Sequence, residues 1–334
     1  MKQNKNVVVI GGGTGTYTVL TGIKHITNIN ITAIVSSADS GGSTGLLRDH
    51  FGQLPVGDFR QCLVALADEG NGDNILRDLF QYRFSKGGIG LEGHNFGNLF
   101  IAALRDILGS EEEAFRKASK ILNVRGRVFP VTYDDIQLVA KYADGSIGYG
   151  EAMIDEPPPT HDGSMKIEQL WVQPKAKINK KAKDALEAAH YIILGPGDLY
   201  TSTIANLVIN QVSHSIKKSR AKIIYISNLV SKYGQTDTFK ISDYVNEIEK
   251  YLDKKINYIL INNKKPSKEV LKKYETEKSH IVRDDLKNDK RVIRKNFLWD
   301  YEIVRKKEDR VKRSLLRHDS KKIAKTIFRI VHQS

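Results

Sequence analysis

The 334-residue sequence is 40% hydrophobic and 28% charged, which is ordinary for a globular protein and long enough to bury the core of one large domain. No apolar run approaches the roughly 20 residues of a membrane helix, and the N-terminus lacks the cleavage pattern of a signal peptide, so we expect a cytoplasmic protein with no membrane partner. The only cysteine, Cys62, excludes an internal disulfide framework and a multi-cysteine metal cluster.

The net charge of +14, from 53 Lys and Arg against 39 Asp and Glu, would attract a polyanion. The basic residues concentrate after Tyr251, in a C-terminal portion at about residues 262–318. This portion has neither interleaved aromatic residues nor a known nucleic-acid-reading motif. We therefore favour a solvated basic surface and keep nucleic-acid binding as a weaker alternative.

The N-terminal elements follow the order strand, helix, strand. The apolar run at residues 7–10 predicts a buried strand, residues 16–25 a helix, and residues 29–35 a second strand. The turn between the first strand and the helix is the run Gly11, Gly12, Gly13, Thr14 and Gly15. Glycines let backbone amides approach an anion that the helix N-terminus also attracts, so this turn is a candidate phosphate site.

A second glycine-rich loop follows the strand at residues 29–35. Its candidate ligand-binding residues are Asp39, Gly41, Gly42, Ser43, Thr44 and, beyond the loop, Arg48. Asp39 could bind a divalent cation such as Mg²⁺, a ribose hydroxyl or the next helix N-terminus, whereas the hydroxyls and the guanidinium suit a phosphate. In an open α/β sheet, loops at the ends of neighbouring strands can face one crevice, where ligands bind.

Residues 57–108 are mainly helical in pattern and supply further candidates at helix starts. Asp58 suits a helix cap, whereas Arg60 in the first turn opposes the helix dipole unless an anion lies nearby. Asn95 and Asn98 begin a later helix and could hydrogen-bond to a base or a sugar. His94 has no second histidine at metal-ligand spacing, so we assign no zinc site.

The middle of the chain departs from the α/β rhythm. Strand-like pieces and turn residues at about residues 128–175 predict a small antiparallel, β-rich insertion. Three further predicted strands then follow at residues 191–194, 222–227 and 256–261. A final helix, capped by Asp319 or Ser320, has the predicted inner face Ile323, Ile327, Ile330 and Val331. We predict one α/β domain over residues 1–334, with a Rossmann-like, mostly parallel sheet flanked by helices.

A third glycine turn follows the strand at residues 191–194. Its candidates are Gly195, Gly197, Leu199, Tyr200, Thr201 and Ser202, and Asn228 ends the next strand. Three such turns together favour a phosphorylated ligand, a nucleotide or nucleotide sugar, over three structural turns. The dinucleotide fingerprint is incomplete because its third glycine falls at Thr16, and neither a Walker lysine motif nor a nucleophile elbow occurs.

The motifs in combination resemble those of a known family. They are GGGTG at residues 11–15, ADSGGSTG at 38–45, PVGDFRQCL at 55–63, GNL at 97–99 and GPGDLYTS at 195–202. In this order they resemble the CofD/YvcK superfamily, the 2-phospho-L-lactate transferase-like proteins. The resemblance runs from about residue 7 to residue 331.

The chain is more similar to the YvcK branch, whose members are called gluconeogenesis factors. The ending LRHD at residues 316–319 indicates this branch. The resemblance implies a regulator that binds a UDP-sugar such as UDP-N-acetylglucosamine and acts in cell shape and growth on gluconeogenic carbon sources. It also places nucleotide-sugar contacts at Tyr274 and Arg317, whose aromatic face and guanidinium suit a base and a diphosphate.

The CofD branch implies an enzyme as the alternative. Its members transfer a phospholactyl group from a guanosine diphosphate-linked donor to a deazaflavin alcohol, with a metal held by aspartate. Asp39 would be the catalytic and metal-binding residue, but Ser40 stands where the family has a second aspartate. That departure weakens the expectation of Mg²⁺ binding and of transfer. The sequence leaves the base, the sugar, turnover and assembly into a homo-oligomer open.

Overall fold

The computed structural model describes residues 4–333 except 42, 46, 48–53, 69–74, 159 and 301–313. Its main element is a seven-stranded sheet in the order β10-β9-β8-β7-β1-β2-β3, with every pair of neighbours parallel. The strands are β1 (Lys5–Gly11), β2 (Ile29–Val35), β3 (Arg127–Pro130), β7 (Tyr191–Leu194), β8 (Lys222–Ile226), β9 (Tyr258–Asn262) and β10 (Val292–Lys295). The predicted Rossmann-like parallel sheet is thus confirmed.

The strand order reverses between β1 and β7. Successive strands run outward from β1 through β2 to β3, and then from β7 through β8 and β9 to β10. Such a reversal leaves a crevice outside the carboxyl ends of the two central strands, which is where open α/β sheets bind ligands. The fold therefore points to the loops after β1 and β7.

Both faces of the sheet are covered because its central strands are apolar on both sides. Val7 and Val9 of β1 face one buried cluster, whereas Val8 and Ile10 face the other, as the alternation of a strand requires. On the first face lie α1 (Gly13–Ile23), α3 (Gly57–Leu66) and α14 (Ser320–Gln333). On the second lie α9 (Lys180–Glu187), α11 (Val212–Lys218) and α12 (Ile241–Leu252).

The C-terminal helix α14 forms as predicted. The Asp319 carboxylate caps it by accepting the Lys322 N–H at 2.9 Å. Its four predicted inner residues are all buried against the first face of the sheet. None of the helices in the described part of the chain has the length and apolar character of a membrane span.

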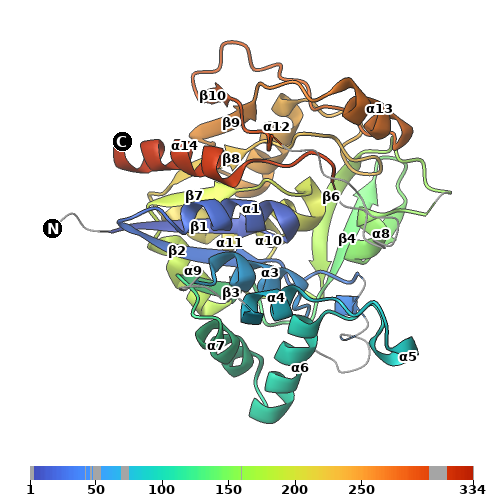
Figure 1. Ribbon diagram of the computed structural model, residues 1–334. Coiled ribbons are helices and arrows are strands. Elements are labelled where there is room, and N and C mark those ends of the chain that lie inside the picture. Colours follow the sequence, from blue (N-terminus) through green and yellow to red (C-terminus); the bar gives the residue numbers. More distant parts are fainter. Residues whose placement is uncertain are drawn as a thin grey trace.

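The remaining helices surround the carboxyl ends and one edge of the main sheet (Figure 1). They are α4 (Ile75–Gln81), α5 (Gly88–Leu91), α6 (Phe96–Leu108), α7 (Glu111–Ile121), α8 (Glu151–Asp155), α10 (Ala205–Leu207), α13 (Lys268–Thr276) and the π-helical turn η1 (Leu199–Ile204).

A second, small sheet is antiparallel, in the order β5-β4-β6. Its strands are β4 (Gln137–Tyr142), β5 (Ile147–Tyr149) and β6 (Ile167–Gln173). It lies beyond the carboxyl ends of the main strands (Figure 1) and within the segment 128–175 where the sequence predicts an antiparallel insertion. The first residues of that segment, up to Pro130, instead form β3 of the main sheet.

Candidate functional site

The loops after β1 and β7 are in direct contact. A Cβ on Gly15 would lie 1.8 Å from the Pro196 carbonyl oxygen, so only glycine permits this approach. The Asn228 side chain, at the end of β8, donates to the Gly197 carbonyl at 2.8 Å. Asn206 donates to the Gly11 carbonyl at 3.4 Å. The structure therefore brings the first and third glycine turns together at the reversal of strand order.

An anionic group already lies at the N-terminus of α1. The Gly13 N–H donates to Asp58 Oδ1 at 2.7 Å, and a Cβ on Gly12 would lie 2.1 Å from Asp58 Oδ2. Helix α1 has no side-chain cap at Gly12. Asp58 therefore caps α1 rather than its own helix, α3, and it marks a position that accepts an anion. A ligand phosphate at this position has to displace the carboxylate.

The second glycine loop packs against the starts of α3 and α6. Asp39 Oδ1 accepts the Gly41 N–H at 2.9 Å, and a Cβ on Gly57 would lie 2.7 Å from Thr44 Oγ1. Ser43 Oγ lies 3.2 Å from His94 Nδ1. Ser43 and Thr44 are buried, so their hydroxyls are turned into the protein. The candidates Gly42 and Arg48 lie outside the described residues.

Arg60, Asn95 and Asn98 hold one another beneath this loop. Arg60 Nε donates to Asn98 Oδ1 at 2.8 Å, and its Nη1 donates to the Phe80 carbonyl at 2.9 Å. Asn95 caps α6 by accepting the Asn98 N–H at 3.2 Å. All three side chains are buried. They fix the loop in place, and a direct contact with ligand stays a prediction for each.

The third loop divides its residues between the core and the surface. Leu199 and Tyr200 are fully buried, and Tyr200 Oη donates to the Ile167 carbonyl at 3.3 Å. Only their backbone can contact a ligand. Thr201 Oγ1 donates to Asp155 Oδ1 at 3.0 Å, and the Ser202 N–H donates to the Asp198 carbonyl at 3.0 Å. Thr14 of the first loop is exposed, and Ser202 is half-buried.

Carboxylates dominate the electrostatics between the loops. Burial and the neighbouring Asp39 raise the pKa of Asp58 to about 7. Burial, followed by Asp39 and Asp155, raises the pKa of Glu151 to about 9. Glu151 also accepts the Ser40 N–H at 3.4 Å. The site therefore holds more acidic groups than it can ionise together near neutral pH.

One lysine balances the acidic groups beside the third loop. Lys232 Nζ lies 2.5 Å from Asp155 Oδ1 and 2.9 Å from Asp198 Oδ2. Burial opposes the charge of Asp155, but the adjacent ammonium holds the pKa of that carboxyl below its usual value. The same two carboxylates raise the pKa of Lys232 although its burial acts in the opposite direction.

Sequence reasoning missed Glu151, Asp155 and Lys232. The first two are four residues apart in α8 and therefore share one face of it, which is a signal that the sequence contains. Lys232 belongs to no recognisable motif, and only the tertiary structure places it between two carboxylates.

Tyr274 is hydrogen-bonded to the backbone just before Arg317. Tyr274 Oη accepts the N–H groups of Leu315 and Leu316 at 2.9 and 3.0 Å. This fixes the segment that leads into Arg317, which is half-buried. The next residue, His318, is buried and lies near the backbone of Ser227, beside Asn228. The segment therefore reaches the carboxyl end of β8.

The donor set around Asp39 does not fit a resident metal ion. Ser40, in place of a second aspartate, uses its hydroxyl to accept the Ala152 N–H at 3.1 Å. Among the described residues, no three His, Cys, Asp or Glu side chains are arranged to hold a metal. We derive no step through a metal.

Comparison with known proteins agrees with this architecture. Residues 7–298 match the family model described as 2-phospho-L-lactate transferase CofD. The chain is 42% identical over 325 residues to a Thermotoga maritima protein named "Putative gluconeogenesis factor", covering 97% of this chain and 98% of that one. It is 34% identical over 336 residues to the gluconeogenesis factor of Bacillus subtilis, covering 100% of both.

A solved structure shows the same fold. The crystal structure of a Bacillus halodurans protein of the UPF0052 family superposes with a TM-score of 0.86 at 34% identity, covering 98% of this chain and 99% of that one. With the family match and the curated relatives, this similarity extends over nearly the whole chain. The chain therefore belongs to the CofD family, in the branch whose curated members carry the name gluconeogenesis factor.

Proposed function

We propose that this protein is a regulator that binds a nucleoside diphosphate sugar, such as UDP-N-acetylglucosamine, at the carboxyl edge of the main sheet. The proposal depends on one observation: the Gly13 N–H, at the start of α1, donates a hydrogen bond of 2.7 Å to the Asp58 carboxylate. It supports an anion site at the start of α1, where the strand order reverses and the β7 loop is in contact.

The surrounding charges bear on how a diphosphate would enter. A dianion beside ionised Asp39, Asp58 and Glu151 would be repelled. The raised pKa values of Asp58, about 7, and Glu151, about 9, mean that protons neutralise part of this charge near neutral pH. Ligand binding should therefore take up protons, and the affinity should fall as the pH rises above about 7.

The nucleotide end would lie toward Tyr274 and Arg317. The aromatic ring of Tyr274 is buried, and its hydroxyl holds the backbone before Arg317. The segment continues to His318, which contacts Ser227 next to the β8 end of the site. This continuity supports a ligand longer than a single phosphate, with its base near α13 and its diphosphate near α1.

The regulatory part of the proposal rests on the relatives, two of which are named gluconeogenesis factor. We extend it to regulation of central carbon metabolism, the cell envelope and cell shape. The departure at Ser40 and the donor set around Asp39 favour a binding protein over a metal-dependent transferase.

Calorimetric titration with UDP-N-acetylglucosamine tests the binding. We expect saturable binding by the wild-type chain and its loss in Gly12→Ala, because the added Cβ would lie 2.1 Å from the position of Asp58 Oδ2, which the phosphate has to occupy. The matched control is Gly90→Ala, whose Cβ would meet open space. Absence of heat at millimolar ligand with folded wild-type protein, or equal binding by Gly12→Ala, would overturn the proposal.

A transferase remains the second candidate because the family model bears that description. It predicts Mg²⁺-dependent release of GMP from a guanosine diphosphate-linked phospholactyl donor, abolished by Asp39→Ala. We expect no release above the rate of the Asp39→Ala protein. Release that needs both Mg²⁺ and Asp39 would replace the regulator with the enzyme.

A further inference from the structure

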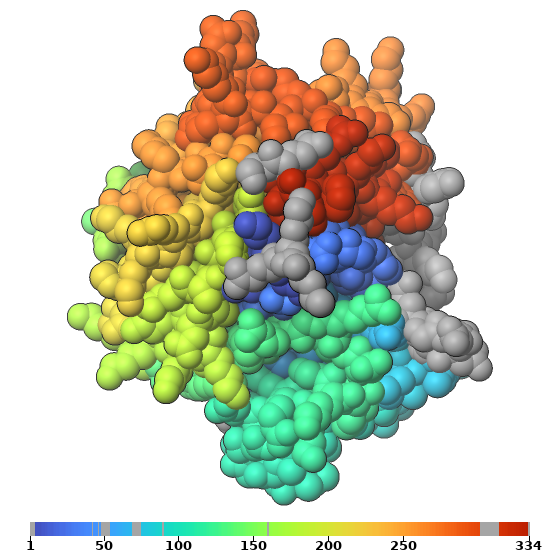
Figure 2. Space-filling model, turned by 90° about the vertical axis from the view of Figure 1, so that its left-hand side faces the viewer, coloured from blue at the N-terminus to red at the C-terminus, as the bar shows by residue number. Residues whose placement is uncertain are grey.

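A cavity of about 900 Å³ lies around the edge strand β3, between α7 and α9. Its floor includes Asn6, near the start of β1, and the paired residues Val8 and Thr32 in the middle of β1 and β2. Figure 2 shows the side of the molecule where α7 (green) and the yellow-green segment containing α9 reach the surface. The cavity is thus separate from the glycine turns at the carboxyl ends of the same strands.

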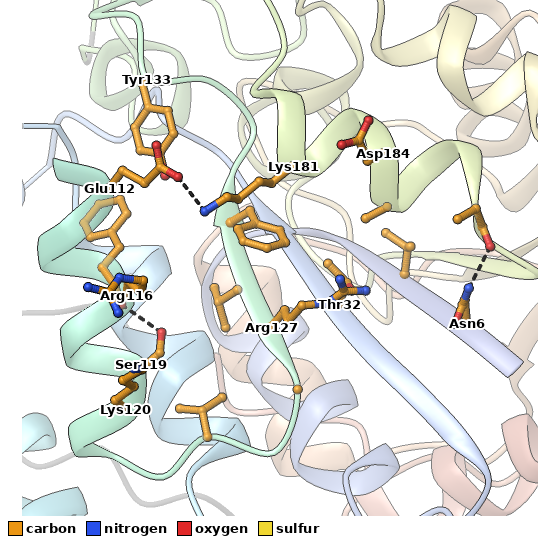
Figure 3. A pocket seen from close by; sticks show the side chains of 18 of the residues that line it. Asn6, Thr32, Glu112, Arg116, Ser119, Lys120, Arg127, Tyr133, Lys181 and Asp184 are labelled. Carbon is orange, nitrogen blue, oxygen red and sulfur yellow. Dashed lines mark hydrogen bonds and ion pairs between the residues drawn. The ribbon is translucent and has the colours of Figure 1, made fainter. Parts of the chain in front are cut away.

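The walls of the cavity combine apolar and basic side chains (Figure 3). Phe115, Val128 and Phe129 supply apolar surface. Four lining residues are basic and two are acidic. Lys181 of α9 and Glu112 of α7 form an ion pair of 2.5 Å that joins the two helices. The lining therefore has a positive balance beside an apolar interior.

Some cations that line this cavity lack a carboxylate partner in the part of the chain that the structure describes. Thr32 is 2% exposed and lines the cavity. Within that same part of the chain, neither Arg127 nor Lys120 pairs with a carboxylate. Arg116, by contrast, pairs with Glu113. Lining cations that no carboxylate neutralises attract a negatively charged group, so they favour an anionic ligand in the cavity.

We propose that this cavity is a second ligand site, for a small organic anion with a carboxylate or phosphate group on an apolar body. Arg127 and Lys120 bind the anionic group, Thr32 donates a hydrogen bond from the floor, and the body lies against Phe115 and Phe129. The volume falls in the range of small-molecule sites, about 300–1,000 Å³. This proposal is independent of the function proposed for the glycine turns.

A small ligand fits better than an added peptide strand. A peptide would have to pair along the outer edge of β3. The start of α9 already occupies part of that edge, since the Asn179 side chain donates to the Pro130 carbonyl at 3.2 Å. The Asn179 N–H donates to the Val131 carbonyl at 2.8 Å. The Glu112–Lys181 ion pair, which joins α7 to α9, lies near this edge of β3.

Fluorescence titration with 8-anilinonaphthalene-1-sulfonate, an aromatic anion, tests the site. We expect one site per chain, weakened at least about tenfold in Arg127→Glu and also weakened in Thr32→Val, which keeps the side-chain shape. The matched control is Arg125→Glu: Arg125 is exposed, pairs with Asp68 and does not line the cavity. Equal affinity in wild-type and Arg127→Glu, or equal weakening in Arg125→Glu, would overturn the proposal.

Competition identifies the anionic group. Displacement of the dye by phenyl phosphate rather than 3-phenylpropanoate assigns a phosphate ester, and the reverse assigns a carboxylate. Displacement by a hexaglutamate peptide but by neither small anion would overturn the small-ligand site. UDP-N-acetylglucosamine titrations and unfolding midpoints unchanged in Arg127→Glu would show that the variant is folded and that the two sites are separate.

Discussion

Replacing Asp58 by Asn should stabilise the protein at alkaline pH. The carboxylate is half-buried beside Asp39, and these two effects raise its pKa from 3.8 to about 7. Its folded-state pKa lies above the unfolded value, so the stability it contributes is complete below pH 3.8 and is lost as the pH rises through about 7. An ionised Asp58 therefore destabilises the fold at pH 8, whereas an Asn side chain is neutral throughout.

The magnitude follows from the pKa difference. Each pKa unit corresponds to about 1.4 kcal/mol, which gives an upper limit of about 4 kcal/mol for Asp58. Partial exposure reduces this value, and so does the weaker hydrogen bond that a neutral amide accepts from the Gly13 N–H. We expect Asp58→Asn to be about 1–3 kcal/mol more stable than wild type at pH 8 and about equal to it at pH 4.

Urea unfolding at pH 4, 6 and 8 measures this difference. Asp106→Asn is the control, because Asp106 is exposed and should change stability by less than about 0.5 kcal/mol at every pH. A stability of Asp58→Asn below that of wild type at pH 8 would refute the reasoning. It would mean that the ionised carboxylate stabilises α1 by more than burial and the neighbouring Asp39 destabilise the ionised form.

Three further substitutions test the contacts that assemble the site. Gly15→Ala should cost about 2–4 kcal/mol in urea unfolding, since its Cβ would clash with the Pro196 carbonyl, whereas Gly90→Ala should be near neutral. Lys232→Met should cost about 2–4 kcal/mol at pH 8 and less at pH 5, where Asp155 and Asp198 can take up protons; a cost that does not depend on pH would contradict this. Tyr274→Phe should cost about 1–2 kcal/mol and lower the affinity for UDP-N-acetylglucosamine several-fold. Tyr149→Phe, at an exposed position, serves as its control. An unchanged affinity in Tyr274→Phe would show that α13 does not contribute to the ligand site.

The architecture was largely predictable because burial patterns are local. Strands β2 and β7 have the predicted bounds, and α14 has the predicted cap and inner face. Glycines after buried strands also indicated where the chain turns at the carboxyl edge. Each of these signals lies within a few neighbouring residues, so tertiary contacts change them little.

The use of individual side chains was not predictable, because it depends on distant partners. The sequence alone could not show that Asp58 caps α1 rather than its own helix. Nor could it show that Ser43 lies against His94. The cluster of Glu151, Asp155 and Lys232 forms only when the small sheet and the β8 loop meet the main sheet.

The sequence by itself determined the strands, the helices and the glycine turns, since hydrophobic periodicity and backbone freedom are properties of short segments. Only the tertiary structure decided that β7 lies beside β1, that the two loops touch, and that a cavity remains around β3. The physical reason is that buried polar groups compete for partners across the whole fold, and the outcome of that competition fixes which groups remain for a ligand.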